Sequence, residues 1–312
     1  MLIITVKNAN PNGNPDEDGD PRQRTDELGE ISPPSFKRKL RETIDNKTGD
    51  VWVNLAQKHK LPEEGYDYEI LENRGRDRDK IRDLILADEE KNHFPTFHKK
   101  YLDARVFGNT FLEGAEVVGG TPKEKEERKR KLKASIKTGA IHFGVGLSVL
   151  PIKIHRETFS IKAGVERGLT AGLAPQAFRY VEGFAVYTMP FFINPNPAAK
   201  TWCTKKDIDL LLDLIPHAYH ANPSLIRPPG GVEIRIAHYV EHADDTLGSF
   251  SDFVLLEYLK PQPKPKDQQK SEAEEPDDLK RLYRVPKFED VKQKLGISCG
   301  AYRELIGFHK WD

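Results

Sequence analysis

An apolar run at residues 2–6 predicts a strand near the start of the chain. The loop after it, residues 8–21, is so rich in Asn, Pro, Gly and Asp that it cannot form a regular helix. Residues 35–44 then predict an amphipathic helix, capped by Ser35 after two prolines, that packs on the sheet of the first strand. Its apolar positions recur every four residues along one face: Phe36, Leu40 and Ile44.

Residues 141–149 carry the clearest strand pattern, because apolar side chains alternate with His, Gly, Gly and Ser. The small residues leave one face of this strand nearly bare, so that another group can approach its backbone or a helix that needs small partners can pack on it. Residues 150–178 alternate again and include several glycines. They predict a projecting hairpin that carries basic and aromatic side chains.

The second half of the chain predicts a strand at residues 184–193, a helix that starts with a capping box at Thr204 and Asp207, and strands at residues 232–240 and 250–259. This order of elements is typical of an α+β fold with a ferredoxin-like or RNA-recognition-type core. A polar, mostly helical insertion interrupts it after the first helix.

Two segments complete this organisation. Residues 261–282 combine prolines with an acidic run and predict a flexible loop. Residues 283–312 return to an amphipathic composition, and we expect them to dock on the core.

Composition points to a protein that meets partners through extended polar surfaces. Hydrophobic residues make up 37% and charged residues 31% of the 312 positions, which is more polar than a compact monomeric enzyme needs. Lys plus Arg and Asp plus Glu both number 49, so the net charge is zero and any nucleic-acid binding must come from local clusters. Residues 123–137 form one such cluster, with eight cations against three anions (8 − 3 = +5).

The cysteines and the apolar runs bear on the compartment. Cys203 and Cys299 are too few and too far apart for a disulfide scaffold or a four-cysteine zinc site, which fits a reducing environment. No apolar run is long enough for a signal peptide or a membrane span. We therefore expect a cytoplasmic protein.

The helix at residues 35–44 predicts an anion site, because its N-terminal amides are free and cations flank its apolar stripe. These cations include Lys37, Arg38 and Arg41. Cations on a helix are also common on ordinary solvated surfaces. The unusual loop and the prolines before the helix favour binding over that simpler interpretation.

The acidic loop offers a second chemistry. Asp16, Asp18, Asp20 and Glu27 match ligand positions of a calcium loop, but Pro21 stands where such a loop needs glycine. Clustered aspartates can also bind magnesium in a nuclease, which is the main enzymatic alternative. Two histidine pairs with zinc-like spacing are a weak signal without cysteines: His217 and His220, and His238 and His242.

Three motifs together carry a family resemblance. They are the loop Asn10-Pro11-Asn12-Gly13, the helix Ser35-x-Lys37-Arg38-x-Leu40-Arg41, and Asp103-x-Arg105-x-Phe107-Gly108. Residues 137–143 and 177–180 add weaker matches in the same order. The chain resembles the CRISPR-associated Cascade backbone proteins, the seventh Cas family of the RAMP superfamily, and is most similar to the type I-B and I-C branches.

This resemblance implies a hand-like protein. An RNA-recognition-type palm would comprise residues 1–46 and 138–260, a helical finger insertion residues 47–137, and a thumb hairpin residues 150–178. Copies would stack head to tail along a CRISPR RNA and leave its bases free to pair with target DNA, together with other Cascade subunits. The family role is noncatalytic and implies neither a cofactor nor a metal.

The resemblance also implies a set of RNA-contacting residues. Phe159 would be a wedge between bases, since aromatic stacking tolerates any sequence. The full set is Asn10, Asn12, Ser35, Lys37, Arg38, Arg41, Arg105, Phe107, His142, Arg156, Thr158, Phe159, Lys162, Arg167, Gln176 and Arg179. Two alternatives stay open: a magnesium-dependent ribonuclease that cuts target RNA from the acidic loop, and a standalone RNA-binding adaptor.

Overall fold

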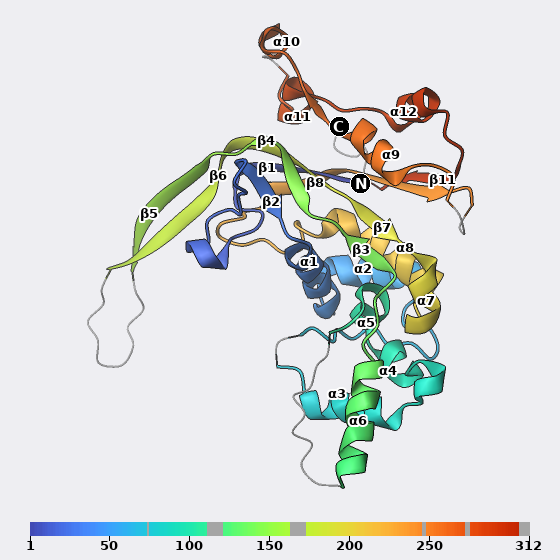
Figure 1. The fold of residues 1–312 in the computed structure, drawn as a ribbon. Helices are drawn as coiled ribbons and strands as arrows, with labels where there is room; N and C mark the ends of the chain where they lie inside the picture. The colour runs from blue at the N-terminus through green and yellow to red at the C-terminus, as the bar shows by residue number, and fades with distance from the viewer. Residues whose placement is uncertain (74, 111–120, 163–172, 245–247, 272–274, 306–312) are drawn as a thin grey trace. The chain divides into compact units, whose positions relative to one another are not determined.

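The computed structural model describes residues 1–73, 75–110, 121–162, 173–244, 248–271 and 275–305 (Figure 1), without the side chains of 159–162, 173–176 and 270–271. The chain forms two compact units. The first comprises Met1–Phe36, Gly144–Pro190 and Asn222–Asp312, and the second comprises Lys37–Phe143 and Phe191–Ala221.

An antiparallel sheet organises the first unit. Its strands lie in the order β11 (Cys299–Glu304), β8 (Val232–His242), β1 (Leu2–Ala9), β6 (Leu173–Met189), β4 (Gly146–Pro151) and β2 (Leu28–Ile31), and β5 (Ile154–Lys162) pairs with β6 outside this path. The apolar run that predicts β1 belongs to a central strand. Leu2, Ile3, Ile4 and Val6 have no exposed surface, so β1 is buried on both faces.

Strand β6 is long enough to serve two partners. Its C-terminal part pairs with β1 from Met189 to Val181, and its N-terminal part pairs with β5 from Val181 outward. The β5–β6 pair is therefore an extension of the sheet beyond the end of β1 (Figure 1). Residues 163–172 between these strands lie outside the described residues.

Short C-terminal elements cover one face of this sheet. They are α9 (Asp252–Leu259), β9 (Gln262–Pro263), α10 (Lys266–Ser271), α11 (Asp278–Leu282), β10 (Tyr283–Arg284) and α12 (Phe288–Leu295). Leu255, Leu279 and Phe288 from these elements join Ile3 and Ile236 of the sheet in one apolar cluster.

Two predictions for this region are wrong. The strand expected at residues 250–259 is helix α9, which Ser251 caps by accepting a hydrogen bond from the backbone N–H of Val254 at 3.4 Å. A short continuous apolar run does not distinguish a strand from a helix, and the cap favours the helix. The described part of residues 261–282, expected as a flexible loop, contains α10, α11 and strand β9, which pairs with β10.

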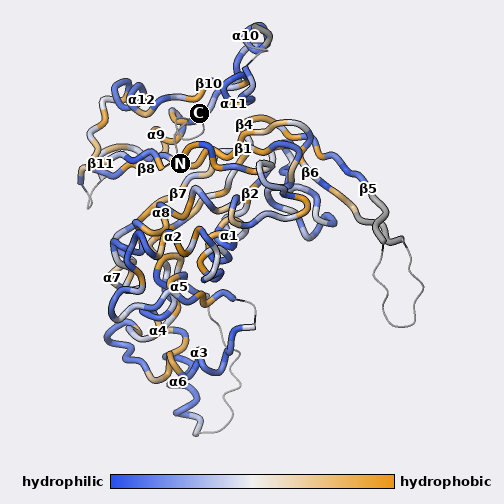
Figure 2. Tube along the Cα trace, turned by 180° about the vertical axis from the view of Figure 1, so that it is seen from behind, coloured by the Kyte–Doolittle hydropathy of each residue, from blue (hydrophilic) through white to orange (hydrophobic). Residues whose placement is uncertain are grey.

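The second unit is mainly helical. Its helices are α2 (Asp50–His59), α3 (Arg78–Ala87), α4 (Pro95–Lys100), α5 (Leu102–Phe107), α6 (Pro122–Ala134), α7 (Pro195–Thr201) and α8 (Lys205–Leu214), with the turns η2 (Glu90–Asn92) and η3 (Ile215–His217). The capping box of α8 is confirmed at Thr204 and Asp207. Strand β3 (Ile141–Phe143) pairs with β7 (Phe191–Ile193). Helix α6 is hydrophilic along most of its length (Figure 2).

The predicted strand at residues 141–149 is two strands in two sheets. Strand β3 belongs to the second unit and β4 to the first, with a break at Gly144 and Val145. The break reverses which residues are buried. Gly146 and Ser148, expected on the bare face, are buried, whereas Val145 is 43% exposed. A shift of one residue exchanges the two faces of a strand.

Helix α1 (Pro33–Asp45) confirms the helix predicted at residues 35–44. The N-cap prediction is wrong, because the helix begins at Pro33 and Ser32 occupies the capping position. The Ser32 hydroxyl accepts a hydrogen bond from the Ser35 N–H at 3.4 Å. Proline fits the first helical turn, where its missing N–H costs nothing. Phe36, Leu40 and Ile44 are fully buried, as their spacing predicts. Within the described residues, no helix combines the length and the apolar character needed to cross a membrane.

Candidate nucleic-acid interface

Two cations of α1 lie against one aromatic ring. Lys37 Nζ and Arg41 Cζ are each 5.3 Å from the centre of the Phe107 ring, which α5 places at its C-terminal end. Phe107 is 7% exposed and also contacts Phe143, with ring centres 6.2 Å apart. The aromatic pair fixes the ring on which both cations rest, and cations over a ring face are attracted to it.

A buried carboxylate sets the direction of Arg41. Its Nε donates a hydrogen bond to Asp103 Oδ2 at 2.8 Å, and Asp103 is 1% exposed. The backbone N–H groups of Leu71 and Glu72 also donate to this carboxylate, at 2.7 and 3.1 Å. Burial raises the pKa of Asp103, while Arg41 and these amides oppose the rise. Arg41 is therefore partly neutralised and held in place.

Lys37 has no such carboxylate. Its side chain is half-buried, and among the described residues it forms no ion pair. Burial lowers the pKa of Lys37, and the neighbouring positive charge of Arg41 lowers it further. A half-buried ammonium beside a guanidinium is stabilised by any anion that approaches it, since the anion supplies the missing counter-charge. This pair is suited to a phosphate oxygen.

The remaining cations of α1 both pair with Glu42, but Lys39 is buried and Arg38 is exposed. Arg38 is exposed and pairs with Glu42 at 2.7 Å, and Lys39 also reaches Glu42, at 3.2 Å. Ser35 is half-buried at the first turn. Exposed pairs of this kind contribute little to stability, so Arg38 can exchange its partner at small cost.

Arg105, which was expected to contact RNA, is buried inside the second unit and is not part of a surface site. Its side chain has no exposed area, and its Nε and Nη2 donate to the two carboxylate oxygens of Asp207 at 3.1 and 3.0 Å. Nη1 donates to the backbone carbonyl oxygens of Asp67, His98 and Lys99. Every nitrogen of the guanidinium is used inside the second unit, which leaves none for RNA.

The glycine of the same motif is required by close backbone packing. Gly108 has φ +78, and a Cβ atom there would lie 2.4 Å from the Lys137 carbonyl oxygen. A Cβ at Gly139 would lie 2.2 Å from the Gly108 nitrogen. The motif from Asp103 to Gly108 therefore builds the interior of the unit, and Phe107 is its contribution to the cationic site.

Asn10 and Asn12, both expected to contact RNA, are buried and hold the loop together. Asn10 has no exposed surface, and its Nδ2 donates to the carbonyl oxygens of Gly19 and Arg179 at 2.8 and 3.0 Å. Asn12 is 7% exposed, and its Oδ1 accepts from both the N–H and the hydroxyl of Ser32 at 2.8 Å. The Asn-rich loop thus fixes the start of α1 and the root of β6.

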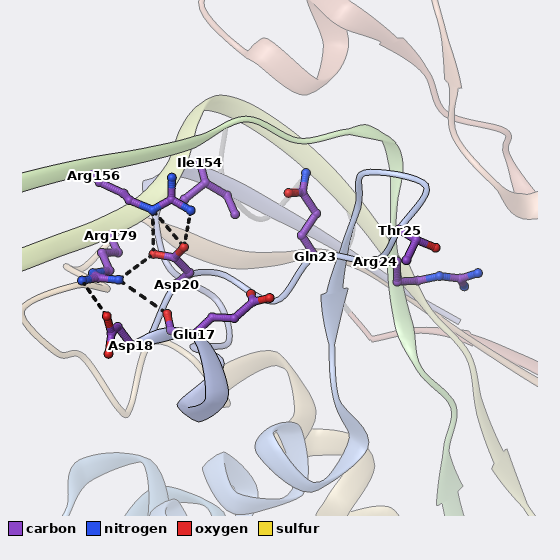
Figure 3. Close-up of a pocket in the computed structure, with 9 residues that line it drawn as sticks. All are labelled: Glu17, Asp18, Asp20, Gln23, Arg24, Thr25, Ile154, Arg156 and Arg179. Carbon is purple, nitrogen blue, oxygen red and sulfur yellow. Dashed lines mark hydrogen bonds and ion pairs between the residues drawn. The ribbon is translucent and has the colours of Figure 1, made fainter.

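Arg156 and Arg179, on β5 and β6, converge on Asp20 of the loop (Figure 3). Arg156 donates from Nε to both Asp20 oxygens at 3.2 and 2.9 Å and also from Nη2, and Arg179 Nη1 donates at 3.2 Å. The hydrogen bond from Arg156 holds the pKa of Asp20 below its usual value. These residues line an open pocket of about 560 Å³.

The other expected RNA contacts fall in several places. Thr158 is exposed on β5, and His142 is half-buried on β3 opposite Phe192 of β7. Phe159, Lys162 and Gln176 lie on β5 and β6, but their side chains are outside the described residues, as is all of Arg167.

The acidic loop and the histidine pairs do not gather into one group. Asp20 is committed to two arginines, and Asp18 lies 3.5 Å from Arg179. His238 contacts the Tyr302 hydroxyl at 3.0 Å, and His242 contacts Asp252. In the part of the chain that the structure describes, no three His, Cys, Asp or Glu side chains are placed to hold a metal ion.

The sequence did not point to the acidic partners of the arginines. In the sequence, Asp20 stands out only as an acidic loop residue and Asp103 only as part of a motif. Arg41 and Asp103 are 62 positions apart, and Arg156 and Asp20 are 136 apart. No local pattern signals such pairs.

These features define a class: an α+β protein with an antiparallel sheet, an extended strand pair, and a cationic site on a helix. The family profile of CRISPR-associated protein Cas7 matches residues 1–282, and the chain belongs to this family. Comparison with curated proteins finds no match.

Two solved structures illustrate the similarity. A chain of a "CRISPR RNA-guided surveillance complex, pre-nicking" aligns with 11% identity and a TM-score of 0.43, covering 95% of this chain and 99% of that one. A chain of a "CRISPR RNA-guided surveillance complex" aligns with 11% identity and a TM-score of 0.36, covering 95% and 98%.

Proposed function

We propose that this protein is a noncatalytic, guide-RNA-binding backbone subunit of a type I Cascade complex. Its membership of the Cas7 family supports this role. Its partners would be CRISPR RNA, further copies of itself, the other Cascade subunits and, through guide pairing, target DNA. We place it in the cytoplasm, with the type I-B and I-C branches as the most similar.

One observation carries the proposal: Lys37 is half-buried beside Arg41 without a carboxylate of its own among the described residues. Phosphate contacts of this kind position a strand and carry no sequence information. Base pairing is then left to read the sequence, as in RNA-guided recognition generally. In this proposal the sheet of the first unit is the palm, the helices within residues 47–137 are the finger, and the β5–β6 pair is the thumb that crosses the RNA.

The distribution of charge supports stacking of copies. The second unit carries 27 cations and 23 anions (27 − 23 = +4), and the first carries 22 and 26 (22 − 26 = −4). Opposite net charges favour head-to-tail contacts between different units of neighbouring copies. Adding guide RNA should therefore convert the protein into particles whose mass grows with RNA length, measurable by light scattering. A fixed one-to-one complex would favour the adaptor alternative.

Lys37→Met tests the phosphate site most sharply. We expect RNA affinity to fall about tenfold, as for the loss of a hydrogen bond to a charged group. The slope of the logarithm of the binding constant against the logarithm of the salt concentration should become about 0.7 less steep, as for one lost phosphate contact. Stability should stay equal or rise, because a desolvated charge is removed. Fluorescence anisotropy at several salt concentrations, with urea unfolding, measures both effects.

Lys80→Met is the matched control, since the Lys80 side chain is 85% exposed on α3 of the same unit. It should change neither affinity nor slope. Arg41→Ala is a poorer probe, because it leaves the buried Asp103 unpaired. Equal RNA affinity of Lys37→Met and Lys80→Met would contradict the assignment of Lys37 as a phosphate contact.

A further inference from the structure

The Asp20 carboxylate joins the two strands at the root of the β5–β6 pair. Arg156 and Arg179 are directly opposed in the register of the two strands. Like charges at opposed positions destabilise a sheet unless a counter-charge lies between them. The Asp20 side chain is 5% exposed and accepts hydrogen bonds from both arginines.

The loop that carries Asp20 is itself fixed. Asn14 N–H donates to the Asp20 carbonyl oxygen at 2.7 Å, and Gly19 N–H donates to the Asn14 carbonyl oxygen at 2.8 Å. Asn10 ties the loop to the backbone of β6 through the Arg179 carbonyl oxygen at 3.0 Å. The carboxylate is therefore presented by a rigid support.

Beyond this root, β5 and β6 pair with each other along their described residues. Strand β6 leaves β1 at Val181, and from there outward β5 is its strand partner. An isolated pair of strands is only marginally stable, so its direction depends on contacts at its base. Hydrogen bonds from an arginine to both oxygens of a carboxylate fix geometry better than a single contact does.

The pocket beside the cluster is balanced in charge. Arg24, Arg156 and Arg179 face the three acids of the same lining: Glu17, Asp18 and Asp20. A phosphate therefore gains little net attraction there. The arginines serve the protein more than they serve an incoming anion.

We propose that Asp20 is a positioning residue that fixes the β5–β6 pair at its root, so that the distal part of the pair meets the guide RNA in one orientation. The contribution to RNA binding rests on the proposed function, whereas the fixing of the strand pair does not. Asp20 thus has a use distinct from the metal ligand of a nuclease.

Hydrogen exchange of Asp20→Asn tests the fixing of the strand pair. We expect amides of residues 154–158 and 177–181 to exchange about tenfold faster or more, as for the loss of charge-assisted hydrogen bonds. Amides of β1 and β8 should be unchanged. Asp16→Asn is the matched control, because Asp16 is exposed in the same loop and forms no ion pair with a described residue. Unchanged exchange in Asp20→Asn would overturn the proposal.

Arg156→Gln and Asp20→Glu distinguish the loss of the Asp20 contacts from a general folding defect. The Arg156 side chain is 60% exposed, so its replacement disturbs no core, and it should accelerate exchange as Asp20→Asn does. Asp20→Glu keeps the charge and should restore part of the protection. If Arg156→Gln leaves the exchange at the wild-type rate, the proposal is wrong.

Nuclease footprinting on bound guide RNA gives the second readout. Wild-type protein and Asp16→Asn should protect RNA with a regular period, and Asp20→Asn should blur that period while the Lys37 site still retains RNA. Absence of RNA binding by the wild type would refute the proposed function and leave the exchange result standing. Magnesium-dependent cleavage of complementary RNA that is lost in Asp20→Asn would overturn the positioning role in favour of catalysis.

Discussion

At the scale of single residues, the buried counter-charge divides the arginines into two groups. Arg105 is surrounded by acceptors and lies between the rings of Tyr66 and Tyr68, each 5.2 Å away. Arg41 has one buried acid and one side open to Lys37. The first arrangement stabilises the fold, and the second leaves positive charge for a ligand.

Arg105→Lys should destabilise the second unit by about 2–4 kcal/mol, because lysine cannot make the paired contact with buried Asp207. The RNA affinity of the folded protein should not change. Urea unfolding and anisotropy measure the two quantities. Arg128→Lys, on the exposed surface of α6, should lie within about 0.5 kcal/mol of the wild type. A stable Arg105→Lys protein that loses RNA affinity would instead support the RNA contact that the family resemblance implies for Arg105.

At the scale of elements, hydrogen bonds link the N-terminus of α1 to the loop that precedes it. Ser32 caps the helix and at the same time donates its hydroxyl hydrogen to Asn12. Asn12 in turn belongs to the loop that ends at Asp20. The loop sequence, rich in turn-forming residues, therefore sets where α1 begins and where β6 leaves the sheet.

Ser32→Ala should cost about 1–2 kcal/mol, since it removes both the cap and the hydrogen bond to a buried amide. Ser35→Ala should be neutral or slightly stabilising, because alanine is a better helix former and Ser35 is not the cap. Thermal or urea unfolding of the two variants measures the difference. Equal losses for both would return the cap to Ser35.

At the scale of the whole molecule, each unit contains a buried neutral histidine. Burial lowers the pKa of His98 in the second unit and of His238 in the first to about 3. Each folded-state pKa lies below the ordinary value of 6.5, so the unfolded chain binds protons first as the pH falls. The contribution of the two buried neutral rings to the free energy of unfolding is therefore fully present above pH 6.5 and is lost progressively towards pH 3.

Stability should therefore fall by about 1.4 kcal/mol per pH unit for each histidine below its unfolded pKa. Urea unfolding between about pH 7 and pH 5 measures this effect, because the paired carboxylates lose their contribution only at lower pH. In the first unit the buried Met1 amino group adds to the pH dependence, since burial lowers its pKa to about 5. His98→Leu should reduce the pH dependence of the free energy of unfolding of the second unit, whereas His220→Leu, at an exposed position, should not. A stability independent of pH in this range would contradict the burial of both rings.

Local patterns were sufficient for elements that depend on their own periodicity. The stripe of α1, strand β1 and the capping box of α8 could be predicted because each depends on neighbours within a few residues. The apolar run of α9 could not be assigned correctly, since helix and strand bury such a run equally well. The alternating run at residues 141–149 did not indicate that its two halves belong to different sheets, because alternation carries no information on the strand with which each half pairs.

The amino-acid sequence alone establishes a basic helix after a turn-rich loop, a balanced total charge, and motifs sufficient for a family resemblance. Which cations remain available to a ligand depends on the fold. Arg105 meets Asp207 across 102 positions, and Arg156 meets Asp20 across 136, whereas Lys37 meets no acid among the described residues. A charge is free or neutralised according to what folding brings beside it, and that neighbour is distant in the chain.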